Sequence, residues 1–373
     1  MKKVQNYEKY WKITLAYTDF NDDKFLTTLE MIVDKIDDLN KDGNYKYNPE
    51  DNKKLQLEIL NKIPKPAKSI KSGLASTRKA INECIKLGFV NPKYQSYHPK
   101  TKEYLNPETD LKKREVIFSE IVYSNARFNN SVTKVHNWSQ INFFIKTLEE
   151  VGILSKKEII ALMTIDIANY HTDFATKEEL VRIIETVEET EFNLRKYNQI
   201  YYLKNILSKL ENIVIEKKGK DYFVKLRPET TIIIDDNLQN EKKGRDKYLH
   251  RLYKIQLMQE SILHFEDTKC MVEQLSYPTL IASHIKPFIK SNEDEAYDPN
   301  NGILLSRNID SLFDLGYITF SDNGEIIFAT HLKQDVKEFI SNYSLDNRFI
   351  NAKRLEYLEY HRKEVFEKRY KYA

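Results

Sequence analysis

The residues best suited to chemistry lie close together in the last third of the chain. His284 ends an apolar run, Asn301-Gly302 closes the loop that follows, and Asp310 and Asp314 come next. A neutral imidazole can take a proton from water. Two carboxylates four residues apart share one face of a helix, where they can hold a hard divalent cation. A base beside such a cation suits phosphodiester hydrolysis, because the cation stabilises the charge on the phosphate and on the departing oxygen.

Three local elements must position these side chains. The apolar run 279–284 predicts a strand that carries His284 at its end. The Asn301 side chain is expected to bond backbone groups across the following loop, which fixes the distance between the base and the cation. A short helix carries the two aspartates, and alternating residues around Asn323-Gly324 predict a β-hairpin after it.

This stretch resembles the His-Asn-His (HNH) endonuclease family over about residues 265–330. His284, Asn301 and Asp310 match the family's histidine, its asparagine and its third metal-site position. The resemblance implies a ββα-metal fold in which His284 is the general base, Asn301 braces the loop and Asp310 binds the metal. Asp314 matches a further helix ligand of colicin-like members.

The sequence departs from the family pattern immediately before His284. Many members have Asp or His there as a metal ligand, whereas this chain has Ser283, which binds a cation only through its hydroxyl or a water. Because Ser283 is a weak ligand, Asp310 and Asp314 are expected to be the main metal ligands. The expected cofactor is Mg²⁺ or another divalent cation such as Mn²⁺.

A C-terminal amphipathic helix, 357–366, is similar to one that closes HNH domains of restriction endonucleases. We expect His361 and Arg362 on it to contact DNA phosphate, since Arg makes bidentate contacts there. The alternative is a solvated helix face with Leu358 and Phe366 packed inward.

The remainder of the chain predicts an α+β protein with a mostly helical N-terminal region. Residues 1–66 are interpreted as a helical support region, 67–150 and 151–235 as two winged-helix-like DNA-binding units, and 242–373 as the HNH nuclease domain.

Each winged-helix prediction rests on a helix followed by a hairpin. In the first, a helix over 76–90 precedes a polar hairpin through 94–104. In the second, a helix over 197–210 precedes two alternating runs that flank Lys218-Gly219-Lys220. Units of this kind also serve as plain packing modules, so DNA contact does not follow from the pattern alone.

Bulk composition excludes several classes of protein. The chain has 373 residues, a formal net charge of +3 and two distant cysteines, Cys84 and Cys270. Neither a disulfide framework nor an all-cysteine zinc site can be built from these two. No apolar run long enough for a membrane span is present, so we expect a cytoplasmic protein without membrane association.

The pattern favours a sequence-specific, type II-like restriction endonuclease that acts on double-stranded DNA. Cutting both strands of a short site suggests a homodimer. Two alternatives remain open: a modification-dependent nuclease that requires methylated DNA, and a nonenzymatic winged-helix DNA-binding protein with a decayed nuclease domain, which Ser283 would favour.

Overall fold

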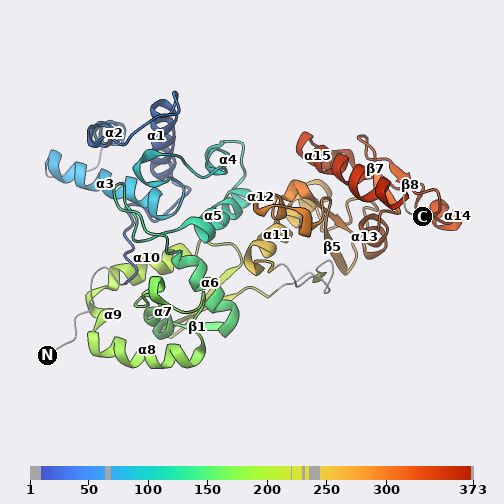
Figure 1. Cartoon of the computed structure of the whole chain (residues 1–373). Coiled ribbons are helices and arrows are strands. Elements are labelled where there is room, and N and C mark those ends of the chain that lie inside the picture. Colours follow the sequence, from blue (N-terminus) through green and yellow to red (C-terminus); the bar gives the residue numbers. More distant parts are fainter. Residues whose placement is uncertain (1–9, 64–68, 220, 229–231, 235–243, 371–373) are drawn as a thin grey trace. The chain divides into compact units, whose positions relative to one another are not determined.

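A computed structural model describes residues 10–63, 69–219, 221–228, 232–234 and 244–370 (Figure 1). Backbone contacts divide the chain into two compact units, 1–227 and 228–373. The four-part division predicted above remains a prediction. Among the described helices, none is long and apolar enough to cross a membrane.

The first unit is largely helical. Side-chain caps define several helix starts: Asp22 accepts from the Lys24 N–H, and Asn48 accepts from Glu50 N–H before Pro49 at the first helical position. Its α-helices are α1 (Asp23–Leu39), α2 (Pro49–Lys62), α3 (Ile70–Lys86), α4 (Thr101–Leu105), α5 (Leu111–Asn125), α6 (Gln140–Val151), α7 (Lys156–Leu162), α8 (Lys177–Thr190), α9 (Phe192–Arg195) and α10 (Tyr197–Leu207).

The first predicted hairpin, 94–104, is wrong. Within this described segment Val90 makes one isolated bridge with Tyr97, and Thr101–Leu105 forms helix α4. The backbone turns away from an extended path at Lys93 and Tyr94, which have φ of 60° and 56°. The helix before it also begins earlier than predicted, because Ser69 caps α3 through a capping box.

The second predicted hairpin is confirmed. Strands β2 (Ile213–Lys218) and β3 (Asp221–Leu226) pair antiparallel directly after α10. The short strand β1 (Ile153–Ser155) pairs with the other edge of β3, so the sheet order is β1-β3-β2. Side chains alternate between the two faces of a strand, and Tyr222 and Val224 are buried on the same face of β3. The alternating apolar residues that predicted the hairpin therefore form its buried face.

The second unit contains the predicted ββα element. Strand β5 (Thr279–His284) pairs antiparallel with β6 (Gly302–Leu305), and helix α13 (Arg307–Asp314) follows. Strand β4 (Ile232–Ile234) pairs parallel with β5. The predicted hairpin is formed by β7 (Ile318–Phe320) and β8 (Ile326–Phe328). The other elements are α11 (Lys247–Phe265), α12 (Glu293–Ala296), α14 (Gln334–Ile340), α15 (Ala352–Tyr360), a π-helix (His361–Phe366) and α16 (Glu367–Tyr370).

Two helices enclose the β5–β6 ribbon: α11 packs on β6, and α13 packs on β5. Their buried apolar side chains share one core with those of the strands. Gly302 is required by this packing, because a Cβ there would lie 2.3 Å from Oη of Tyr253 on α11. The glycine of the Asn301-Gly302 pair therefore serves a close approach of helix and strand.

Candidate active site

The end of strand β5 presents two adjacent polar side chains to different surroundings. Successive residues of a strand point to opposite faces. His284 contacts the aromatic ring of Tyr253 on α11, whereas Ser283 lies beside Asp310 on α13. The predicted base and the predicted metal ligands therefore lie on opposite faces of the strand end.

His284 lies in an aromatic setting that fixes its ring. The ring stacks on Tyr253 with centroids 4.7 Å apart and meets Phe288 edge-on at 5.7 Å. His250, also on α11, is nearly parallel to His284 at 6.3 Å. The His284 side chain is 5% exposed, so its orientation is set by packing.

The tautomer of His284 follows from one contact. Its Nε2 lies 3.0 Å from the carbonyl oxygen of Ala296. A carbonyl can only accept a hydrogen bond, so Nε2 carries the proton in the neutral ring. The basic lone pair of the neutral ring is then on Nδ1, which is the nitrogen able to receive a proton from water.

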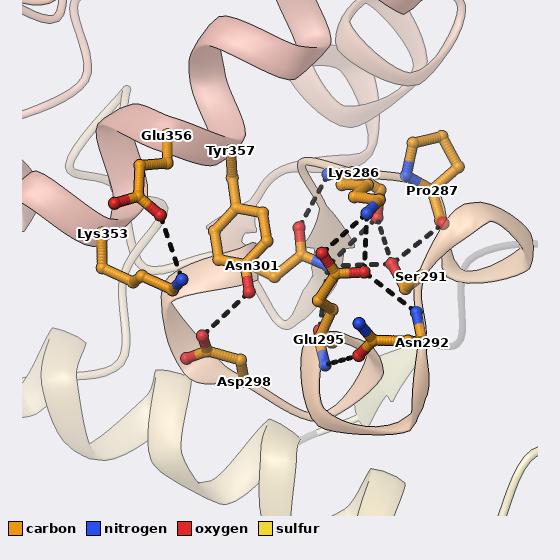
Figure 2. Close-up of polar contacts among 10 residues, drawn as sticks. All are labelled: Lys286, Pro287, Ser291, Asn292, Glu295, Asp298, Asn301, Lys353, Glu356 and Tyr357. Carbon is orange, nitrogen blue, oxygen red and sulfur yellow. Dashed lines mark hydrogen bonds and ion pairs between the residues drawn. The ribbon is translucent and has the colours of Figure 1, made fainter.

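Asn301 ties the loop between β5 and β6 (Figure 2). Its Oδ1 accepts from the Lys286 N–H at 2.7 Å, and its Nδ2 donates to the carbonyl oxygens of Lys286 and Glu295 at 3.1 and 3.0 Å. Nδ2 also lies 3.2 Å from Oγ of Ser291. Asn301 is fully buried. These bonds link the strand end to the segment that supplies the carbonyl partner of His284.

A salt bridge reinforces the same loop. Lys286 Nζ lies 2.6 Å from a carboxylate oxygen of Glu295, and that carboxylate also accepts from the Asn292 N–H at 2.9 Å. These two contacts lower the pKa of Glu295, and the Lys286 contact is the larger cause. The adjacent residue Ala296 is the carbonyl partner of His284, so this network holds the tautomer-setting group in place.

Asp310 and Ser283 form the other side of the site. Both are buried, and neither Oδ1 of Asp310 nor Oγ of Ser283 has a hydrogen-bond partner of normal geometry in the described residues. The pKa of Asp310 is raised to about 6, mainly by burial; the nearby Ser283 hydroxyl opposes the shift, and the charge of Asp314 adds to it. Asp314, one helical turn along, is half-buried.

These oxygens fit a hard divalent cation. A buried carboxylate oxygen without a donor is costly unless something positive satisfies it. Mg²⁺ commonly takes only one or two protein carboxylates and keeps several waters. Among the described residues, no group of three or more His, Cys, Asp and Glu is arranged to hold a metal. The residues that could hold a cation at this position are Asp310, Asp314 and Ser283, the last through its hydroxyl.

Residues 270–321 match the family model HNH_2, an HNH endonuclease. The match supports the HNH family for this segment, which includes His284, Asn301 and Asp310. An HNH endonuclease domain indicates DNA nuclease activity and DNA binding, and HNH nucleases generally use divalent metals. No curated protein matches the chain.

The predicted DNA contact of His361 is contradicted by its burial. The ring is 1% exposed and stacks on Phe313 at 3.8 Å. Its Nδ1 lies 2.9 Å from Oγ1 of Thr319, and its Nε2 lies 3.1 Å from the carbonyl oxygen of Phe313. The amphipathic pattern could not reveal this, because a π-helix over 361–366 changes which residues face inward.

Arg362 is also engaged within the protein. Its guanidinium donates to the carbonyl oxygen of Phe320 at 2.7 Å and to Asp322 at 2.7 Å, so it connects the C-terminal helix to the β7–β8 hairpin. A phosphate would have to compete with both partners. The phosphate contact of Arg362 therefore stays a prediction without geometric support.

His361 should instead control stability at acid pH. Burial lowers its pKa to about 3, below the ordinary 6.5, so between these values the unfolded chain binds the extra proton. Stability is therefore lost as pH falls below about 6.5, by roughly 2 kcal/mol at pH 5. We expect urea unfolding to show this loss in the wild type and a much smaller loss in His361→Gln. The exposed His331→Gln should retain it, and equal acid sensitivity of both variants would contradict the assignment.

Sequence reasoning missed the residues that orient His284. Tyr253 and His250 lie more than 30 positions earlier, and only the packing of α11 brings them to the strand end. Tyr253 Oη is 3.3 Å from the carbonyl oxygens of both Ser283 and Asn301. The helix that carries both rings has only a weak amphipathic pattern, so the sequence gives little indication of its buried face and none of the strand that this face packs against.

Proposed function

We propose that this protein is a metal-dependent endonuclease that cuts double-stranded DNA at a short sequence, in the manner of a type II restriction enzyme. The observation that carries the proposal is a pair of buried oxygens, Oδ1 of Asp310 and Oγ of Ser283, which have no hydrogen-bond partner of normal geometry among the described residues. Ser283 directly precedes His284, whose neutral tautomer is set by Ala296. Both lie in the segment that matches an HNH endonuclease.

In this proposal His284 is the general base. With Nε2 donating to Ala296, Nδ1 takes a proton from a water as the water oxygen bonds to phosphorus and the bond to the 3′ oxygen breaks. Stacking on Tyr253 holds the imidazole in plane during the transfer. Only a water molecule has to reach this buried ring, so a low exposed fraction is compatible with the role.

Asp310, Asp314 and the Ser283 hydroxyl would hold the cation, Mg²⁺ or Mn²⁺. When bound, it supplies charge stabilisation to the phosphate and the departing oxygen. The two aspartates supply negative charge at this position, and the burial of Asp310 and Ser283 limits access of water to it. The raised pKa of Asp310 means that a proton competes for this position below about pH 6.

Recognition of a short sequence is assigned to the first unit. Helix α10 leads directly into the β2–β3 hairpin, and Lys217 and Lys218 are exposed near its turn. A helix beside a basic hairpin is the arrangement that the second winged-helix interpretation requires, with a helix in the major groove and lysines at phosphates. Because the hairpin of the first predicted winged-helix unit does not form, the proposal of sequence recognition rests on the second unit.

A homodimer completes the proposal, because a twofold pair of subunits brings one site to each strand of a short duplex sequence.

The purified protein with Mg²⁺ should cut a defined plasmid into discrete fragments, and end sequencing should give one recurrent sequence at the cut. His284→Ala is the control for a contaminating nuclease. Random degradation by the wild type would remove the specificity part of the proposal. Tight DNA binding without cleavage by either protein would favour a decayed nuclease domain.

Digestion of methylated and unmethylated copies of the same plasmid separates the remaining alternative. A restriction enzyme of the proposed kind cuts the unmethylated copy. Cleavage of the methylated copy alone would assign the protein to the modification-dependent class.

A further inference from the structure

The exposed side of helix α3 in the first unit carries three basic residues and no acidic residue of the helix itself. Lys71, Arg78 and Lys79 are all exposed. Starting from Lys71 and turning about 100° per residue, Arg78 lies at about −20° and Lys79 at about 80°. The three cations thus lie within about 100° of each other on one side of the helix.

These cations have no partner in the described part of the chain. No ion pair or hydrogen bond joins the side chains of Lys71, Arg78 or Lys79 to any described residue. Other lysines of the same unit do have partners. Those pairs are Lys102 with Asp37, Lys112 with Glu115, and Lys113 with Glu103. An unpaired group of like charges repels itself, so a fold gains nothing from it internally.

Helix α3 itself places no acidic side chain on this face. The sequence has no Asp or Glu between Ile59 and Asn82. The one acidic residue of α3, Glu83, is buried, and its Oε2 accepts from the N–H groups of Ala16 and Tyr17 at 2.6 and 3.0 Å. Glu83 therefore serves as a hydrogen-bond acceptor inside the unit and does not offset the positive charge of the exposed cations.

Two further residues of α3, Lys86 and Ala75, add no charge to this face. Lys86 is buried, and its Nζ donates to the carbonyl oxygens of Lys12 and Phe128 at 2.5 and 2.6 Å, so it is a structural lysine. Ala75, between the exposed cations, has a small side chain that allows close approach of another backbone.

We propose that this face, defined by Lys71, Arg78 and Lys79, binds the phosphate backbone of duplex DNA. Along the helix, Arg78 lies about 10 Å and Lys79 about 12 Å from Lys71. Phosphates of one strand repeat every 3.4 Å along the duplex axis, so these intervals span about three base steps. The contacts are to backbone and position the duplex without reading its sequence. The inference rests on the proposed function, because DNA is the polyanion that the nuclease segment indicates.

Salt dependence of binding tests this surface. Full-length protein is titrated into a labelled duplex in EDTA, where no cutting occurs, at salt between about 50 and 200 mM. If all three cations meet phosphates, Lys71→Gln, Arg78→Gln and Lys79→Gln combined reduce the slope of log K against log salt by about 2.7. Affinity at the lower salt should fall roughly 10- to 100-fold.

A triple variant with the same charge change is the control: Lys102→Gln, Lys112→Gln and Lys113→Gln, whose lysines already have acidic partners. Its slope should match the wild type. If the α3 variant kept the wild-type slope of log K against log salt and the wild-type unfolding temperature, the proposed DNA contact of this face would be rejected. The proposed function would still stand as long as the wild type cuts DNA. A reduced slope in a protein that never cuts DNA would support the surface and reject the proposed function instead.

Discussion

Replacing His284 with Phe should lower the single-turnover cleavage rate by about 10²- to 10⁴-fold, the usual contribution of a general base. Phe keeps an aromatic ring against Tyr253 and Phe288 but has no nitrogen at either position. The fold should therefore persist while proton transfer is lost. Cleavage is measured by quenched flow or manual sampling with excess enzyme, and DNA affinity is measured separately in EDTA, where it should remain close to the wild type.

Chemical rescue separates a base from a structural residue. In His284→Ala, added imidazole should restore part of the cleavage, because the small base can occupy the space and accept the proton. His171→Ala, which removes an exposed histidine of the first unit, should cut at the wild-type rate. Full activity of His284→Phe would reject the base assignment, and loss of activity without any rescue would indicate a packing role.

The parts of the site that the sequence could predict are those specified locally. An apolar run ending at His284, an Asn-Gly pair and two aspartates at helical spacing each follow from residues close in the chain. The strands, the helix and the hairpin at 318–328 form where expected for that reason. Local patterns set element type because backbone periodicity depends on neighbouring residues.

The parts that the sequence could not predict depend on tertiary packing. The ring of Tyr253 reaches His284 because α11 covers β6, and no spacing in the sequence encodes that pairing of surfaces. His361 has the polar character of a surface residue, yet Phe313 and Thr319 enclose it. Likewise, the turn at Tyr94 replaced a hairpin, since a buried tyrosine with its hydroxyl bonded to Asn52 fixes the chain there.

Asp310→Asn should have opposite effects on stability and on cleavage. In the wild type the folded-state pKa of about 6 lies above the ordinary 3.8, so the folded protein binds a proton more tightly than the unfolded chain. Stability of the metal-free protein therefore falls as pH rises from about 4 to about 6, by on the order of 2 kcal/mol. Above pH 6 the neutral amide of the variant avoids this cost, so metal-free Asp310→Asn should unfold at a higher temperature.

The same change should remove the response to metal. At pH 8, Mg²⁺ or Mn²⁺ should raise the unfolding temperature of the wild type, because a ligand that binds only the folded state stabilises it. The variant should show no such rise, and its cleavage rate should fall on the order of 10³-fold, which corresponds to several kcal/mol of lost charge stabilisation. Asp294→Asn, an exposed carboxylate of the same unit, should behave as wild type in both assays. If metal raised the unfolding temperature of Asp310→Asn as much as that of the wild type, this carboxylate would be excluded as a metal ligand. Its buried Oδ1, which has no hydrogen-bond partner among the described residues, would then need another explanation.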